Sequence, residues 1–182
     1  MTPRYGMVIL TNRCVRCMAC VVACRAENNV PAGESRNWIL ETEVRGEFPN
    51  LGLSYEPGQC MQCEKPHCVR VCPVGATSKD EDGIVRIDRD LCLGCRYCIQ
   101  ACPYAARFPN TDLGVADKCD FCTHRVRAGR EPACVDTCPS RARVFGDLND
   151  PESEVSKLIA QNRTRRVKVE AGTDPKIYYI DG

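Results

Sequence analysis

Short apolar runs separated by turn residues are the most regular feature of this chain. The segment "YGMVIL" (5–10) precedes the first cysteines, and "GIVRID" (83–88) is rich in β-branched residues. The polar turn "KDEDG" (79–83) precedes the second run, so that run and "GATS" (75–78) are expected to form a β-hairpin. The pattern predicts short strands and little regular secondary structure.

Short helices are expected around the cysteines that follow each run. The segment "RYCIQAC" (96–102) predicts one or two helical turns, and Pro103 ends them because proline cannot continue a helix. "MACVVAC" (18–24) repeats this arrangement after the first apolar run. Arg25 stands there in place of a proline, so this helix is expected to continue into "RAENN" (25–29).

One longer amphipathic helix is predicted in "PESEVSKLIAQNR" (151–163), with Val155, Leu158 and Ile159 on one side. Two hypotheses remain open for this apolar side. It packs on its own domain, or it docks against a partner subunit.

No segment has the length of a membrane span. The longest apolar run near the N-terminus is "MVIL", which is too short for a signal-peptide core, and no twin-arginine signal is present. No stretch approaches 18 apolar residues. We therefore expect no direct membrane span, and another polypeptide would have to carry this one to a membrane.

The composition is ordinary in charge and unusual in its number of cysteines. The 182 residues include 25 basic and 24 acidic side chains, with a formal net charge of +1, so nucleic acid is not an expected partner. The length allows one or two small domains. Sixteen residues are cysteine, a density that indicates disulfides, zinc or iron–sulfur clusters.

The cysteines form four groups of four, and none is left over. The groups are Cys14, Cys17, Cys20 and Cys24; Cys60, Cys63, Cys68 and Cys72; Cys92, Cys95, Cys98 and Cys102; and Cys119, Cys122, Cys134 and Cys138. Proline follows the last cysteine of the second, third and fourth groups. Four groups of four cysteines fit four sites of four thiolates each.

The spacing within the groups favours iron–sulfur clusters. Runs of C-x2-C-x2-C cannot form disulfides within themselves without strain, although disulfides could join different groups. Zinc prefers two separated C-x2-C pairs, an arrangement that only the fourth group approaches. The spacing C-x2-C-x2-C-x3-C-P is that of bacterial ferredoxins. We expect four [4Fe-4S] clusters, with zinc as the main alternative.

This chemistry predicts the fold class and restricts the function. We expect an α+β fold of duplicated bacterial-ferredoxin-like modules, with short β-hairpins and short helices around four clusters. A cubane held by four thiolates has no open coordination site, so it transfers electrons and does little else. We therefore predict an electron-transfer chain without catalytic residues. A free-standing polyferredoxin is the alternative.

Beyond the spacing, "CPVGAT", "CPYAAR" and "ACVDTCPSRARVFGDLNDPES" resemble the four-cluster electron-transfer subunits of membrane-associated molybdopterin oxidoreductases. That family includes the iron–sulfur subunits of polysulfide, thiosulfate, tetrathionate, dimethyl-sulfoxide and arsenate reductases. The resemblance extends from about Tyr5 to Tyr179. It implies electron relay between an integral-membrane quinone-reactive subunit and a molybdopterin-containing catalytic subunit, in anaerobic respiration of a sulfur compound or a related acceptor.

The resemblance also implies an exchange of ligands between groups. The first three cysteines of a group bind one cubane and the fourth reaches the cubane of a partner group; groups one and four are partners, as are groups two and three. The implied ligands are Cys14, Cys17, Cys20 and Cys138 for cluster 1; Cys24, Cys119, Cys122 and Cys134 for cluster 2; Cys60, Cys63, Cys68 and Cys102 for cluster 3; and Cys72, Cys92, Cys95 and Cys98 for cluster 4. The spacing alone leaves open that each group closes on its own cluster.

The same pairing implies the domain organisation. Residues 1–59 and 103–150 would form one module with clusters 1 and 2, including an insertion at 25–59. Residues 60–102 would form an inserted module with clusters 3 and 4. Residues 151–182 would be a C-terminal helix and tail, which we expect to serve as a docking segment.

Two differences between this sequence and other members of the family bear on its clusters and its partners. Cys95 fills a position where the respiratory nitrate reductase subunit has a tryptophan and a three-iron cluster, so all four sites are expected to hold four irons. Formate dehydrogenase and some hydrogenase relatives end in a membrane helix, whereas this chain ends in "KIYYIDG". A separate membrane subunit is therefore expected, although an electron-transfer role in a formate dehydrogenase or hydrogenase stays open.

Co-export with a signal-bearing subunit would place the complex on the periplasmic face of the membrane. The cytoplasmic face is the alternative.

Other side chains near the cysteines are assigned lesser roles. His67 and His124 are expected to lie outside the ligand set, because sixteen cysteines already suffice. Trp38 is expected in the core or at an interface.

Charge near the clusters predicts a difference in redox potential, because positive charge favours the reduced form. The loops of cluster 1 carry Arg13, Arg16, Arg141 and Arg143. The loop of cluster 4 carries Arg89 and Arg96 but also Asp88 and Asp90. Charge count thus predicts a higher potential for cluster 1 than for cluster 4. The alternative is that these arginines point into solvent, where screening leaves a small effect.

Overall fold

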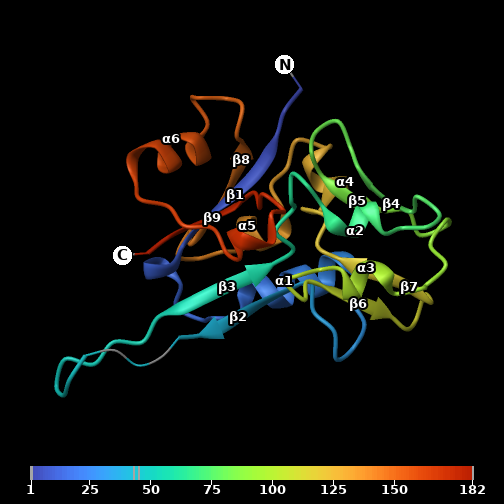
Figure 1. Ribbon diagram of the computed structural model, residues 1–182. Helices are drawn as coiled ribbons and strands as arrows, with labels where there is room; N and C mark the ends of the chain where they lie inside the picture. The colour runs from blue at the N-terminus through green and yellow to red at the C-terminus, as the bar shows by residue number, and fades with distance from the viewer. Residues whose placement is uncertain (1, 43, 45, 182) are drawn as a thin grey trace.

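A three-stranded sheet joins the beginning and the end of the chain (Figure 1). The computed structural model describes residues 2–42, 44 and 46–181. Strand β1 (Tyr5–Leu10) lies in the middle of the sheet, antiparallel to β8 (Arg143–Asp147) and parallel to β9 (Ile177–Ile180). The strand expected from the first apolar run is therefore present, and its partners come from the last quarter of the chain.

The two faces of β1 contact different cores. Met7 and Ile9 point into a core that also contains Cys20 and Cys134, whereas Val8 and Leu10 point into a second core on the other face. Because side chains alternate along a strand and both faces are buried, this segment is apolar at every position instead of alternating.

The other named strands of the described residues pair in three antiparallel hairpins. They are β2 (Asn37–Glu41) with β3 (Tyr55–Gln59), β4 (Thr77–Lys79) with β5 (Val85–Ile87), and β6 (Arg107–Asn110) with β7 (Val115–Lys118). The hairpin of β4 and β5 confirms the expectation from the "KDEDG" turn.

The helices are short and most of them carry cysteines. They are α1 (Ala19–Asn28), α2 (His67–Arg70), α3 (Tyr97–Gln100), α4 (Thr123–Val126), α5 (Ala133–Asp136) and α6 (Glu154–Gln161), with 3-10 turns η1 (Thr11–Arg13) and η2 (Val169–Ala171). Helix α1 continues four residues beyond Cys24, as the absence of a proline predicted. None of the helices in the described ranges is long and apolar enough to span a bilayer. The mixture of short helices and short strand pairs confirms the α+β fold class.

The most extensive helix–helix contacts among the described residues join two pairs of helices. Helix α1 of the first cysteine group packs against α5 of the fourth group, and α2 of the second group packs against α3 of the third group. The contacts therefore join the same groups that the family resemblance pairs.

Helix α6 packs on β8 and β1, at the edge of the molecule in Figure 1. Ser153 caps its N-terminus, where the Ser153 hydroxyl accepts a hydrogen bond from the Ser156 backbone N–H. Val155 is fully buried in the second core, and Leu158 and Ile159 pack against the same core. The predicted apolar side of this helix thus lies against its own sheet.

Candidate iron–sulfur centres

One cavity brings together four cysteines from two groups. Cys60, Cys63 and Cys68 of the second group line it with Cys102 of the third. Its other walls include Pro66, Pro103, Tyr104 and Arg107. A largely apolar cavity lined by four cysteines has the donor set of a cubane, because sulfur ligands bind iron clusters and the apolar wall excludes water.

The thiols of the first and fourth groups also approach one another. Asn28 Nδ2 lies 3.7 Å from Cys24 Sγ and 3.6 Å from Cys122 Sγ, so one amide bridges the two groups. Burial raises the pKa of the Cys24 thiol to about 12, and the neighbouring Cys134 and Cys122 act in the same direction. These thiols would be held as thiolates only beside compensating positive charge, such as iron.

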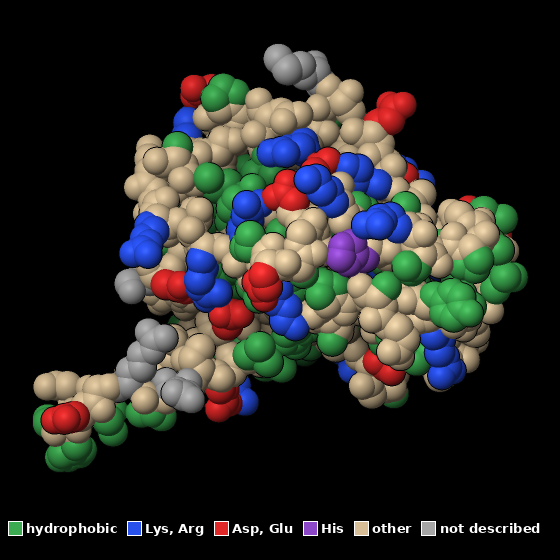
Figure 2. Space-filling model, in the orientation of Figure 1, with side chains coloured by type: hydrophobic (Ala, Val, Ile, Leu, Met, Phe, Trp, Pro, Cys, Tyr) green, Lys and Arg blue, Asp and Glu red, His purple; other side chains and the backbone are tan. Residues whose placement is uncertain are grey.

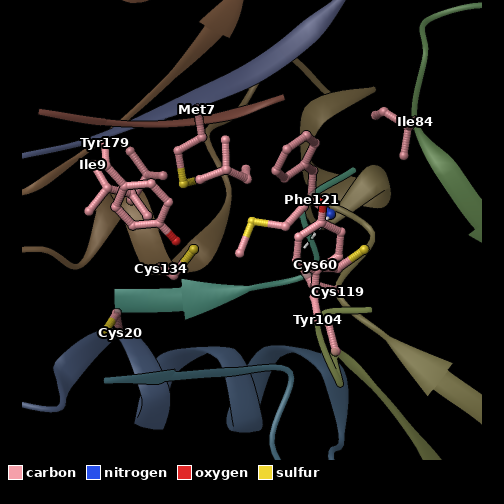
Figure 3. Close-up of a cluster of buried hydrophobic side chains, with 14 residues drawn as sticks. Met7, Ile9, Cys20, Cys60, Ile84, Tyr104, Cys119, Phe121, Cys134 and Tyr179 are labelled. Carbon is pink, nitrogen blue, oxygen red and sulfur yellow. Dashed lines mark hydrogen bonds between the residues drawn. The ribbon is translucent and has the colours of Figure 1, made fainter. Parts of the chain in front are cut away.

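Cys14 and Cys138 are close enough to interact electrostatically although 124 positions separate them in the sequence. Burial is the main cause that raises the pKa of the Cys14 thiol, and the charges of Cys20 and Cys138 contribute in the same direction. Four buried cysteines from groups one, two and four share one core with Met7, Phe121 and Tyr104, as Figure 3 shows: Cys20, Cys60, Cys119 and Cys134.

The remaining site combines one buried, two half-buried and one exposed cysteine, as the set of Cys14, Cys17, Cys20 and Cys138 does. Cys98 is buried, Cys72 and Cys92 are half-buried, and Cys95 is exposed. The backbone N–H of Thr77 lies 3.4 Å from Cys72 Sγ. Backbone hydrogen bonds from Thr77, Val74 and Ala76 lower the pKa of the Cys72 thiol, although burial acts in the opposite direction.

The four C-x2-C loops share a backbone feature that the sequence did not reveal. In the first C-x2-C loop of each group, the residue before the second cysteine has a positive φ: Arg16 at 54°, Gln62 at 46°, Gly94 at 66° and Phe121 at 57°. Three of these residues are not glycine, so the left-handed conformation is strained and requires support from its surroundings. The shared geometry indicates four equivalent loops, each shaped around the same kind of ligand.

Backbone N–H groups also point at cysteine sulfurs. The Ala142 N–H lies 3.3 Å from Cys138 Sγ, and the Phe121 N–H lies 3.5 Å from Cys119 Sγ. Hydrogen bonds of this kind stabilise negative charge on sulfur and help to set the potential of a bound cluster. Together with the cavity and the loops, they fit [4Fe-4S] clusters.

Known proteins with these features identify the family. A "4Fe-4S dicluster domain" model matches residues 51–148, and a second model of the same description matches residues 13–76. The sequence is 45% identical to a "Putative dimethyl sulfoxide reductase iron-sulfur subunit" of Halobacterium salinarum, over 98% of its own length and 79% of the relative. It is 44% identical to one of the polysulfide reductase proteins of Wolinella succinogenes, over 99% of its own length and 95% of the relative. It is 48% identical to "Protein NrfC" of Escherichia coli, over 97% of its own length and 80% of the relative.

The protein belongs to the iron–sulfur electron-transfer subunits of molybdopterin oxidoreductases. This membership confirms the resemblance found in the sequence. Sixteen cysteines and two dicluster domains provide for four [4Fe-4S] clusters, as expected. In this family the role of such a subunit is electron relay in anaerobic respiration.

The residues outside the ligand set are placed as follows. His124 is exposed and its Nε2 lies 2.6 Å from Glu27 Oε1, while His67 lines the cavity of Cys60 and Cys102. Trp38 on β2 is half-buried against the core that contains the cysteines. Arg16 is exposed and forms an ion pair with Glu41. Since that charge is both screened and paired, Arg16 is a weaker source of positive potential than the charge count assumed.

The sequence analysis did not predict that arginines near the cysteines would be buried. Arg36, Arg107 and Arg143 are each at most 5% exposed. Their burial follows from tertiary packing. The only sequence indication is the repeat of "C-P-x-x-A-R" at 102–107 and 138–143.

Proposed function

We propose that this subunit relays electrons between an integral-membrane quinone-reactive subunit and a molybdopterin-containing catalytic subunit. The observation that carries the proposal is the exposure of one cysteine in each of two groups, Cys17 and Cys95, amid exposed apolar side chains. A relay needs redox centres close to the surface on both sides, so that an electron can enter at one and leave at the other. The bound clusters would supply the one-electron chemistry.

The proposed ligand sets are those implied by the family. Cys14, Cys17, Cys20 and Cys138 hold cluster 1; Cys24, Cys119, Cys122 and Cys134 hold cluster 2; Cys60, Cys63, Cys68 and Cys102 hold cluster 3; and Cys72, Cys92, Cys95 and Cys98 hold cluster 4. The cavity shared by the second and third groups supports the exchange, as does the amide of Asn28 beside Cys24 and Cys122. The same pairing supports a module of 1–59 with 103–150 and an inserted module of 60–102.

Apolar surface surrounds each exposed cysteine. Val15 and Val22, two and five positions from Cys17 in the sequence, are 63% and 65% exposed, and Leu93 and Tyr97, each two positions from Cys95, are 69% and 61% exposed. Exposed apolar clusters of this kind mark interaction surfaces. We assign the surface near Cys17 to the catalytic subunit and the surface near Cys95 to the membrane subunit, following the family.

Two further segments offer contact surface. Residues 46–54, which precede β3, project from the body of the molecule, and Figure 2 shows hydrophobic side chains gathered there; Phe48 of this segment is 88% exposed. In residues 151–182, docking has to use the outer polar face of α6, because its apolar side is buried. Membrane association through partners, on the periplasmic face, completes the proposal; the cytoplasmic face is the alternative.

Charged substitutions at the two apolar surfaces should separate the two partners. In the intact complex with Leu93→Asp, quinol should no longer reduce the clusters while dithionite still does, because the new charge opposes contact only near Cys95. Val22→Asp should release the catalytic subunit on purification and leave the membrane subunit in place. Val169→Asp is the matched control, because Val169 is 52% exposed on η2 and belongs to neither surface.

Equal loss of both partners in the two variants would contradict the assignment of separate surfaces. So would unchanged binding and quinol-driven reduction in both, since a buried carboxylate at a protein interface is costly.

A further inference from the structure

Two arginines occupy the same position in a repeated segment. The segment "CPYAAR" ends at Arg107 and "CPSRAR" ends at Arg143, so each arginine follows the fourth cysteine of its group by five residues. Each is the first residue of a strand, β6 and β8 respectively. In the second group the segment is "CPVGAT", and Thr77 stands at the equivalent position. The repeat places one such arginine in each pair of cysteine groups.

Both guanidinium groups are buried without a carboxylate. Arg143 is 2% exposed and Arg107 is 4% exposed. Arg143 Nη1 donates to Gln59 Oε1 at 2.5 Å, and Arg107 Nη1 donates to Thr77 Oγ1 at 3.3 Å. Within the described part of the chain, the Nη2 atom of each arginine has no hydrogen-bond partner. Burial of an unpaired charge is expensive, so an anion has to compensate.

A third buried arginine shows the usual solution. Arg36 is 5% exposed, and it forms ion pairs with Asp117 at 2.7 Å and with Asp120 at 3.2 Å. The fold thus provides carboxylates for one buried arginine close to the cysteines. It provides none within ion-pair distance, among the described residues, for Arg107 or Arg143.

Cysteine side chains lie beside both arginines. Arg107 lines the same cavity as Cys60, Cys63, Cys68 and Cys102, and Arg143 lines another cavity with Cys138. Burial by itself would lower the pKa of the Arg143 guanidinium, but the thiolates of Cys134 and Cys20 raise it above its ordinary value. Burial likewise acts to lower the pKa of Arg107, and the thiolates of Cys68, Cys60 and Cys98 raise it.

The cysteines that act on the charge of each arginine come from both sites of one pair. Under the proposed ligand sets, Cys20 and Cys134 belong to clusters 1 and 2. Cys60 and Cys98 belong to clusters 3 and 4.

We propose that Arg143 and Arg107 are the buried counter-ions of the two cluster pairs, each balancing the negative charge of both clusters in its own pair. This inference rests on the proposed function through the ligand sets. A fixed positive charge close to a cluster stabilises the reduced form more than the oxidised form, because reduction adds one negative charge. Each arginine consequently raises the midpoint potentials of its own pair, and its burial prevents solvent from screening the effect.

The test replaces each arginine by glutamine and by lysine in the complete complex. Arg143→Gln should lower the midpoint potentials of clusters 1 and 2. At a fixed applied potential, the ratio of reduced to oxidised cluster should fall at least about tenfold, which corresponds to a shift of ~59 mV for a one-electron couple. Arg107→Gln should do the same for clusters 3 and 4, and each variant should leave the other pair near its wild-type potentials. Redox titration followed by EPR gives the potentials, and iron analysis reports whether the clusters are present.

Two matched variants complete the design. Arg141→Gln removes an exposed arginine two residues before Arg143, and solvent screening should make its shift small. If a glutamine variant loses iron, the lysine variant decides: Arg143→Lys with full iron and potentials near wild type supports the counter-ion role. Loss of iron in the lysine variant as well would show that the shape of the arginine matters rather than its charge, and would overturn the inference.

Unchanged potentials in iron-replete glutamine variants would overturn the inference and leave the relay function intact. A shift of the same size in all four clusters, or in Arg141→Gln, would overturn it too. A wild-type complex without iron–sulfur clusters would instead refute the proposed function.

Discussion

Replacing Cys138 by serine should damage the cluster that Cys14, Cys17 and Cys20 hold, rather than the one nearest in sequence. A serine hydroxyl is a poor substitute for a thiolate at an iron site, so the cubane should be lost or should lose one iron. The iron content should fall from about sixteen to roughly twelve to fifteen per chain. The spectrum of cluster 1 should disappear in the EPR redox titration, while those of the other three clusters remain.

Cys134→Ser provides the matched comparison, because Cys134 lies only four positions before Cys138. It should remove cluster 2, the site shared with Cys24, and leave cluster 1 intact. If both variants abolish the same cluster, the fourth group closes on itself and the exchange of ligands is wrong.

Removal of iron should unfold the cysteine-lined core. Seven of the sixteen cysteines are buried: Cys20, Cys24, Cys60, Cys98, Cys119, Cys122 and Cys134. Helices α2 to α5 have four residues each, which is too short to be stable without tertiary contacts. Without clusters, this core would lose its largest constituents, and the buried Arg107 and Arg143 would lose their compensating charge.

Hydrogen exchange can locate that loss. After anaerobic chelation of iron, amide protection should vanish around the cysteines of α1 to α5. It should persist longest in β1 and β8, because Val8, Val144 and Val155 form a core without cysteine. Protection that is unchanged throughout the iron-free chain would show that the fold does not depend on the clusters.

Cysteine spacing predicted the cofactor because four thiolates around a cubane need close spacing in the chain. The short helix at Tyr97 and the hairpin after Ala76 followed from local turn and helix signals, and both are present. The end of α1 beyond Cys24 followed from the missing proline.

The rest depended on contacts between distant segments. The pairing of β1 with β9 joins Met7 to Ile177, and no local pattern specifies a parallel partner so far away. The β2–β3 hairpin was missed because Pro57 and Gly58 lie inside β3 and weaken the strand signal.

The number of charged residues near each cluster in the sequence does not give the strength of their effect, because burial depends on contacts between distant segments. Arg16 and Arg143 count equally in the sequence, yet Arg16 is exposed and paired with Glu41 while Arg143 is buried. Arg107 was not counted at all, because it lies in the segment after Cys102 and reaches the sites only in the folded chain. Burial, which sets the strength of a charge, is a property of the fold.

The most direct test of the central claim is iron and acid-labile sulfide analysis of the anaerobically prepared subunit, with zinc measured in the same sample. Four cubanes held by sixteen cysteines predict about sixteen irons and about sixteen sulfides per chain, with no stoichiometric zinc. Stoichiometric zinc without sulfide, or stable disulfides without iron, would contradict the assignment of this protein as a four-cluster electron relay.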